Sequence, residues 1–301
     1  MTDSPAPCRG RFAPSPTGPL HFGSLVAAVG SYLDARQRGG EWLLRMEDLD
    51  PPREMPGAAD HILRTLEAYG FEWDGPVWYQ SRRGEAYQAA LETLRDAGLV
   101  FDCACTRREL RDLAPAGIDG PLYPGTCRDG LPPGRAPRAV RMRVAAHRVG
   151  IEDRLQGLIS QQLDTQVGDF ILRRADGLFS YQLAVVVDDG AQGITDVVRG
   201  SDLLDSTPRQ VYLQQRLGLA TPTYLHLPVA TNPAGEKLSK QTHAAAIPDD
   251  VDVEILCRSL RFLGQEVPAD LAEADRAAFW EWAIRHWDTA RIPACRARLP
   301  D

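Results

Sequence analysis

Residues 11–24 read Arg-Phe-Ala-Pro-Ser-Pro-Thr-Gly-Pro-Leu-His-Phe-Gly-Ser, and this stretch decides the fold class of the 301-residue chain. A short strand at 9–13 ends in Pro14, a Pro/Gly turn follows, and a helix begins at His21. The first turn of a helix presents unpaired backbone N–H groups and a positive dipole end, which suit a phosphate. His21 can bond a phosphoryl oxygen, and Gly23 lets a nucleotide approach the backbone. Taken alone, the same residues also fit a helix cap without a ligand.

Strand and helix patterns alternate along the chain after this turn. Apolar residues at helical spacing predict helices over 21–36, 62–69 and 87–94. The apolar run 42–46 predicts a buried strand between the first two. This order predicts an α/β fold with a doubly wound, Rossmann-like parallel sheet. Farther along, we expect strands at 169–172, 181–187 and 224–229, and helices at 208–217, 252–264 and 275–287.

The composition is that of an ordinary globular protein, with 44% hydrophobic and 25% charged residues, and it excludes a disordered, collagen-like or coiled-coil chain. The formal net charge of −7 excludes a protein that coats nucleic acid by bulk positive charge. Basic residues gathered on one face could still bind RNA. No apolar run approaches the ~18 residues of a membrane span, and residues 1–10 hold no apolar segment typical of a signal peptide. We therefore expect a cytoplasmic protein with no membrane partner.

A second informative stretch lies in the polar loop 231–242, after the strand predicted at 224–229. It reads Lys237-Leu238-Ser239-Lys240-Gln241. Two lysines beside a serine can close over a triphosphate and neutralise the departing pyrophosphate. The alternative for either lysine alone is a solvated surface side chain. Because this loop and the turn before His21 both follow predicted strands, we expect them to converge at one edge of the sheet.

Together the two stretches match the paired signatures of class I aminoacyl-tRNA synthetases, with Ser24 in place of the usual second histidine. Over residues 9–250 the chain also resembles the catalytic domain of glutamyl-tRNA synthetases. The segments that carry this resemblance, in the same order, are residues 11–24, RMEDLDPPRE at 45–54, YQLAVVVDD at 181–189, VRGSDLL at 198–204 and STPRQ at 206–210. The resemblance implies a ligase that activates glutamate with ATP.

Glutamate has two carboxylates and one ammonium, and the resembling segments offer the complement. Arg11 and Arg199 are candidate carboxylate partners, because a guanidinium meets a carboxylate with two hydrogen bonds. Glu47 is the candidate partner of the ammonium, and Ser15 and Tyr181 can add neutral hydrogen bonds. Which arginine holds which carboxylate stays open. Without the motifs, surface ion pairs would explain both arginines.

The resemblance also assigns the ATP site and the catalytic residues. It implies in-line attack of the glutamate α-carboxylate on the α-phosphate, giving glutamyl-adenylate and pyrophosphate, with Mg²⁺ carried in by ATP. The catalytic residues would be His21, Lys237 and Lys240. The ATP-binding residues would be the same three with Gly23 and Ser239.

The chain also resembles a shortened paralogue of this family. After the loop that contains Lys237, the segment 251–301 is long enough for two helices but not for an anticodon-binding domain. We therefore expect no such domain. The paralogue places glutamate on queuosine in the tRNA(Asp) anticodon, where a cyclopentene cis-diol stands in for a terminal ribose. We therefore expect tRNA(Asp) as the partner of a monomer. The alternatives are a truncated synthetase that charges the tRNA 3′ end, a small-molecule adenylyltransferase, and a non-catalytic RNA-binding module.

Three cysteines fall within a Pro/Gly-rich stretch of little periodicity. Cys103, Cys105 and Cys127 are a zinc signal, since Zn²⁺ takes four tetrahedral ligands. The paralogue's pattern implies Tyr123 as the fourth ligand of one structural zinc. A water molecule or His147 could serve instead, and three free buried cysteines are the alternative without metal.

We expect the zinc to brace an insertion that meets RNA. The expected organisation is the first half of the catalytic domain at 1–100, the zinc and RNA-contact subdomain at 101–168, the second half at 169–250 and a helical segment at 251–301. Arginines crowd the insertion and suit phosphate-backbone docking, with ordinary solvated side chains as the alternative. They are Arg107, Arg108, Arg111, Arg128, Arg135, Arg138, Arg141 and Arg143.

Overall fold

A twisted parallel sheet lies at the centre of the computed structural model, which describes residues 7–113, 115–118, 120–238, 245–248, 250 and 252–300. Strands β1 (Arg9–Phe12), β2 (Glu41–Met46) and β3 (Trp78–Tyr79) pair in parallel. Strands β11 (Asp196–Gly200) and β12 (Thr223–Leu227) form a second parallel pair. The two groups meet where the amide of Thr195 donates to the carbonyl of Arg9 at 3.0 Å. The resulting order, β3-β2-β1-β11-β12, is the predicted doubly wound arrangement, and the strand order reverses between β1 and β11.

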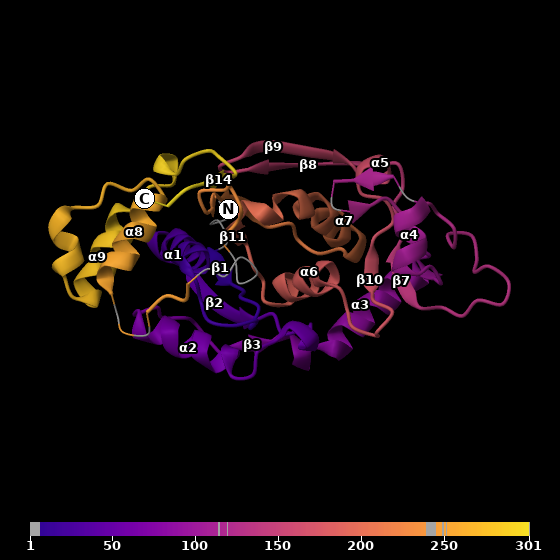
Figure 1. The fold of residues 1–301 in the computed structure, drawn as a ribbon, viewed down its shortest axis with the longest axis horizontal. Helices are drawn as coiled ribbons and strands as arrows, with labels where there is room; N and C mark the ends of the chain where they lie inside the picture. Colours follow the sequence, from indigo (N-terminus) through magenta and orange to yellow (C-terminus); the bar gives the residue numbers. More distant parts are fainter. Residues whose placement is uncertain are drawn as a thin grey trace, which may run out of the picture.

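The segment between β3 and β11 adds antiparallel strand pairs to this elongated molecule; those of β7 and β10 lie toward one end, and the hairpin of β8 and β9 runs along the central sheet (Figure 1). One three-stranded sheet has the order β10-β7-β4, and a hairpin of β8 and β9 extends the central sheet because β8 pairs in parallel with β12. Two short pairs complete the strands. The bounds are β4 (Val100–Cys103), β5 (Ala116–Gly117), β6 (Gly120–Pro121), β7 (Ala139–Met142), β8 (Arg148–Asp153), β9 (Gly157–Gln162), β10 (Ile171–Arg173), β13 (Val229–Ala230) and β14 (Ala297–Arg298).

Helices cover the sheet and its two ends. The bounds are α1 (Phe22–Gln37), α2 (Ala58–Ala68), α3 (Gly84–Asp96), α4 (Arg107–Leu113), α5 (Leu163–Gln166), α6 (Tyr181–Ala191), α7 (Thr207–Leu217), α8 (Val253–Phe262) and α9 (Arg276–His286). The short 3₁₀ turns are η1 (Pro51–Arg53), η2 (Gln80–Arg82), η3 (Ser201–Ser206), η5 (Ala269–Glu273) and η6 (Thr289–Arg291).

The C-terminal helices α8 and α9 pack against α1 at the opposite end of the molecule from the Cys103 region (Figure 1). Aromatic side chains fill this contact: Tyr32 meets Trp42 edge-on at 5.1 Å between ring centroids and Trp280 at 4.8 Å. Trp280 and Trp287 are buried. These C-terminal aromatics therefore serve packing, which stabilises the helix that opens the functional site.

The strand predicted at 181–187 is wrong, because this segment forms helix α6. A short apolar run cannot distinguish a buried strand from a buried helix, and here the run is buried around most of the helix. The Ser180 hydroxyl caps the helix by accepting from the amide of Leu183. Residues 188–190, which directly follow the predicted strand, form the last part of α6, with Asp188 and Asp189 buried.

Within the described residues, no helix has the length and apolarity required to span a membrane.

Candidate active site

A cavity of about 200 Å³ opens beyond the carboxyl ends of β1 and β11, where the strand order reverses. Ligands bind at this position in doubly wound sheets, because the diverging loops leave a crevice there. The structure brings most of the predicted site residues together at it: the lining includes Arg11, His21, Gly23, Glu47, Tyr181, Arg199 and Lys237. Ser15 lines an adjoining cavity that shares Glu47 and Tyr181.

His21 is the N-cap of α1. Its Nδ1 accepts from the amide of Ser24 at 3.3 Å, and the Ser24 hydroxyl accepts from the amide of His21 at 3.4 Å. The cap and the phosphate site expected from sequence therefore coincide, since the capping imidazole also lines the cavity. A Cβ on Gly23 would lie 3.2 Å from the His21 ring and 3.4 Å from the carbonyl of Leu238, so glycine keeps this helix start open.

Lys237 reaches the same cavity from the loop after β13. A bridge between Thr231 and Lys237 and a hydrogen bond from the Leu238 amide to the Ala230 carbonyl at 2.7 Å form this turn. The Lys237 ammonium pairs with Asp202 at 2.5 Å. Ser239 and Lys240 lie outside the described residues.

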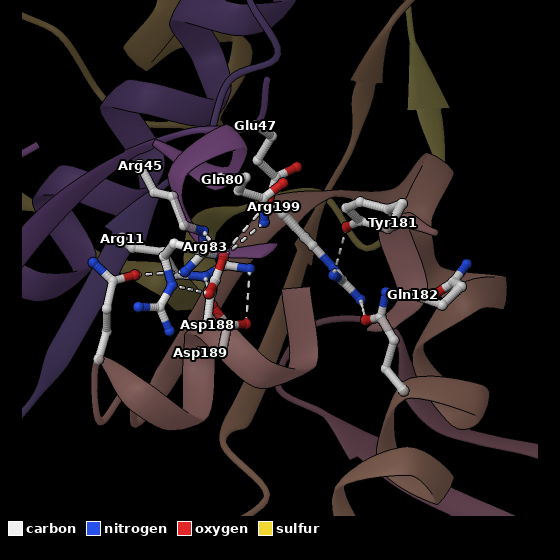
Figure 2. Close-up of polar contacts among 12 residues, drawn as sticks. Arg11, Arg45, Glu47, Gln80, Arg83, Tyr181, Gln182, Asp188, Asp189 and Arg199 are labelled. Carbon is white, nitrogen blue, oxygen red and sulfur yellow. Dashed lines mark hydrogen bonds and ion pairs between the residues drawn. The ribbon is translucent and has the colours of Figure 1, made fainter. Parts of the chain in front are cut away.

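Arg199 projects from β11 with three of its nitrogens bound to protein groups. Its Nε donates to Nε2 of His226 at 3.0 Å, and its Nη2 donates to Thr207 at 2.8 Å and to Gln210 at 2.7 Å. Nη1 lies 3.3 Å from the hydroxyl of Tyr181, on the cavity side (Figure 2). The guanidinium is thus held rigidly and presents one edge toward a ligand.

A buried histidine fixes this orientation. His226 Nδ1 lies 2.6 Å from Asp153 Oδ2, and both side chains are fully buried. Burial, together with the Arg199 charge, lowers the pKa of His226 to about 4, so the imidazole is neutral near pH 7. Because Asp153 is an acceptor, Nδ1 carries the proton and Nε2 is left to accept from Arg199.

Arg11 is bound to an acid of α6 rather than being free at the surface. Its Nε donates to Asp189 at 3.1 Å, and Arg45 donates to the same carboxylate at 2.7 Å. Asp188 accepts from Gln80 and Arg83 at 2.9 and 2.6 Å. Figure 2 shows Arg11, Arg45 and Arg83 gathered near this acidic pair, below Glu47 and to the left of Arg199. Burial alone would raise the pKa of Asp189, but Arg11 and Arg45 lower it, so this carboxylate stays charged.

Glu47 directly follows β2 and lines the cavity, and one of its carboxyl oxygens lacks a hydrogen-bond partner among the described residues. Its Oε1 accepts no hydrogen bond from the described residues, and the nearest cation, Arg45, lies 3.5 Å away. Burial raises the pKa of Glu47 to about 7, against the opposing effect of Arg45. A buried carboxyl in this state gains free energy when a cationic ligand group arrives.

Sequence reasoning missed the groups behind the cavity. Asp188 and Asp189 were visible in the sequence as an acidic pair, but the segment before them was predicted as a strand, so their position on a buried helix was not foreseen. Nothing in the sequence indicated a functional role for Arg45, because it lies within an apolar strand. His226 and Asp153 are 73 residues apart in sequence and meet only through the pairing of β8 with β12.

The three cysteines predicted as metal ligands converge in the structure. The Sγ atoms of Cys103, Cys105 and Cys127 lie within 4.8 Å of one another. The Tyr123 hydroxyl lies 3.5 and 3.7 Å from the first two sulfurs. His147 packs against the ring of Tyr212 instead, at 5.8 Å between centroids. Three thiols and a phenol offer a donor set that fits tetrahedral zinc.

Half of the arginines expected to face RNA bind the protein itself. Arg141 is buried over the Tyr123 ring at 4.1 Å. Arg135 pairs with Glu109 at 2.8 Å, and Arg128 and Arg143 donate to backbone carbonyls. The members that stay exposed are Arg107, Arg108, Arg111 and Arg138.

Comparison with known proteins identifies the family. The model for "tRNA synthetases class I (E and Q), catalytic domain" matches residues 7–267. A glutamyl-Q tRNA(Asp) synthetase of Dechloromonas aromatica is 65% identical over 96% of both chains. One of Chromobacterium violaceum is 59% identical over 97% of both chains.

A solved glutamate–tRNA synthetase of Elizabethkingia anophelis is 25% identical, with a TM-score of 0.79 over 96% of this chain and 67% of that one. A glutamate tRNA ligase of Elizabethkingia meningosepticum, solved in complex with its amino acid, is 26% identical, also with a TM-score of 0.79, and the match covers 66% of it. The chain therefore belongs to the class I tRNA synthetases of the E and Q type, in the group that contains these glutamyl-Q tRNA(Asp) synthetases.

Proposed function

We propose that the protein activates L-glutamate with ATP to glutamyl-adenylate and transfers the glutamyl group to queuosine in the anticodon of tRNA(Asp). The relatives named for that activity match nearly the whole chain. The observation that carries the proposal is the cavity itself. It places the buried Glu47 carboxyl, the fixed Arg199 guanidinium and the N-terminus of α1 around one space.

Glutamate fits this cavity by charge. Its ammonium meets Glu47, whose Oε1 accepts no hydrogen bond from the described residues. Its two carboxylates meet Arg11 and Arg199, and Ser15 and Tyr181 add neutral hydrogen bonds. Because Arg11 and Arg199 are already held by Asp189 and His226, binding costs little side-chain entropy.

The first step joins glutamate to AMP. An oxygen of the α-carboxylate attacks the ATP α-phosphorus, and the bond to the β-phosphate bridging oxygen breaks, releasing pyrophosphate. His21 and the backbone at Gly23 hold the triphosphate at the start of α1. Lys237 and Lys240 neutralise the pyrophosphate as it leaves, and Ser239 helps to bind ATP. Mg²⁺ enters with ATP and shields the phosphate charge.

The second step forms an ester. A queuosine hydroxyl oxygen bonds to the glutamyl carbonyl carbon, and the bond from that carbon to the phosphate oxygen breaks. AMP leaves, and the hydroxyl proton passes to its phosphate oxygen. The protein contributes chiefly by positioning the two reacting groups.

We further propose that Cys103, Cys105, Tyr123 and Cys127 hold one structural zinc. Cys103, Tyr123 and Cys127 belong to a small buried cluster, separate from the two larger cores, whose other buried members are Phe101 and Ala104. A zinc there would brace the inserted subdomain at 101–168, from which Arg107, Arg108 and Arg138 are available to the RNA backbone. The catalytic halves would be 1–100 and 169–250, with 251–301 a helical segment, and the chain would act as a monomer.

The test combines ATP, labelled glutamate and tRNA pools with and without queuosine, followed by nuclease mapping of the label. We expect label only in queuosine-bearing tRNA(Asp), in the anticodon loop. Label that persists without queuosine and disappears when the terminal CCA is removed would show a 3′-end synthetase instead. Pyrophosphate exchange driven equally by any amino acid would show a general adenylyltransferase.

A further inference from the structure

A second cavity, of about 600 Å³, adjoins the substrate cavity, and no residue role proposed above explains its size. The two share Ala13, Glu47, Tyr181, Asp202 and Lys237 in their walls. A molecule in the larger cavity would therefore lie directly against glutamate bound in the smaller one. Its volume falls in the ~300–1,000 Å³ range of ligand pockets.

Two segments far apart in sequence form its outer wall. Asp50, Arg53 and Glu54 come from the turn after β2, and Arg174 and Phe179 come from the connection between β10 and α6. Arg174 donates to Asp50 at 3.1 Å, and so ties the two segments together. The wall is thus built and fixed before any ligand arrives.

The charges of this cavity are unevenly matched. Asp50 pairs with Arg53 and Arg174, and Asp202 pairs with Lys237. Glu54 and Glu47 each keep a buried Oε1 that accepts no hydrogen bond from the described residues. Burial, reinforced by the charge of Asp48, raises the pKa of Glu54. Arg174 also lines this cavity, and its buried Nε finds no acceptor among the described residues. Because the unmatched carboxyl oxygens outnumber this one donor, the cavity suits a ligand that chiefly donates hydrogen bonds.

A third acceptor without a donor among the described residues lines the larger cavity. The Gln80 side chain is 1% exposed and lines the larger cavity. Its amide nitrogen donates to Asp188 at 2.9 Å, whereas its Oε1 accepts no hydrogen bond from the described residues. A buried amide oxygen left without a donor costs free energy unless a ligand supplies one.

We propose that this second cavity is the acceptor subsite, which takes an RNA nucleoside that carries a vicinal diol and an amine. The proposal rests on the function proposed above and adds the residues that select the acceptor. Hydroxyl and ammonium groups are donors, so they match Glu54 and the Gln80 oxygen. The modified base of queuosine has both, whereas the terminal adenosine of tRNA offers a diol without the amine. Phe179 supplies an aromatic wall for the ring system.

The experiment separates activation from transfer. Glu54→Gln removes the charge and one acceptor from the subsite and leaves the substrate cavity intact. We expect glutamate-dependent ATP–pyrophosphate exchange, measured without RNA, to stay within about twofold of wild type, and single-turnover transfer to queuosine-bearing tRNA(Asp) to slow by at least about tenfold. Glu85→Gln makes the same change on the exposed surface of α3, outside both cavities, and should alter neither step.

The free base of queuosine serves as a direct probe, because its only vicinal diol is the one on the cyclopentene ring. It should compete with tRNA in the transfer assay of the wild-type protein and leave pyrophosphate exchange unchanged, and periodate cleavage of that diol should abolish the competition. Transfer by Glu54→Gln at the wild-type rate, or parallel loss of exchange and transfer, would overturn the subsite. Failure of the wild-type protein to transfer glutamate at all would instead refute the proposed function, so the two failures are distinguishable.

Discussion

At the scale of single residues, Glu47 sets the expected pH dependence of glutamate binding. Burial raises its pKa to about 7, so the carboxyl is neutral below that pH and charged above it. Only the charged form attracts the substrate ammonium. We therefore expect kcat/KM for glutamate, measured by pyrophosphate exchange, to rise between about pH 6 and pH 8. The Glu47→Gln variant should have a low kcat/KM for glutamate at every pH, and its kcat/KM should not rise between about pH 6 and pH 8. A wild-type profile that is flat through this interval would contradict the assignment.

His226 acts through Arg199 rather than on the substrate. Its neutral Nε2 accepts from Arg199 at 3.0 Å, so His226→Leu removes the acceptor and leaves a buried charged donor unsatisfied. A hydrogen bond to a charged group contributes ~1.5–3 kcal/mol, which corresponds to an increase of at least about tenfold in KM for glutamate. His226→Gln keeps an acceptor and should recover part of the loss.

The readout that separates positioning from simple folding is the split between KM and kcat. Thermal unfolding of both His226 variants should be measured alongside the exchange kinetics. If His226→Leu lowers the melting temperature while KM for glutamate stays at the wild-type value, the histidine is structural only.

At the scale of elements, the first turn of α1 combines a cap with a phosphate site. His21→Ala removes both and should cost ~1 kcal/mol of unfolding free energy, because the amide of Ser24 loses its acceptor. His21→Asn keeps a capping side chain and should retain that stability. The rate of ATP–pyrophosphate exchange should fall about 100-fold in both variants, since neither supplies the imidazole. Urea unfolding and exchange assays check the two effects separately, and full activity of His21→Asn would contradict the catalytic role.

The sequence predicted this element well because strong local signals coincide there. Pro14, the Pro/Gly turn and the apolar spacing after His21 all mark one boundary, and β1, α1 and β2 lie where expected. The strand predicted at 181–187 was wrong because the apolar run there fits a helix and a strand equally well. The support of Arg199 could not be predicted at all, since His226 and Asp153 meet only after the β8–β9 hairpin joins the central sheet.

At the scale of the whole molecule, the cysteine cluster and the substrate cavity belong to different parts of the structure. We expect elemental analysis to find about one zinc per chain, because four donors satisfy one tetrahedral ion. Cys105→Ser should lower the zinc content and accelerate hydrogen exchange in β4 and β7, next to the cluster. The protection of the amides of β1 and β11 against hydrogen exchange should stay unchanged. A zinc-free wild-type protein with the same protection pattern would contradict the metal site.

The central claim is that glutamyl-adenylate occupies the cavity between the ends of β1 and β11. A crystal structure with a non-hydrolysable glutamyl-sulfamoyl adenosine tests it most directly. We predict the ammonium within hydrogen-bond distance of Glu47, a carboxylate on Arg199 and the sulfamoyl group beside His21. An analogue bound elsewhere, or bound here with its amino-acid part away from Glu47 and Arg199, would contradict the account.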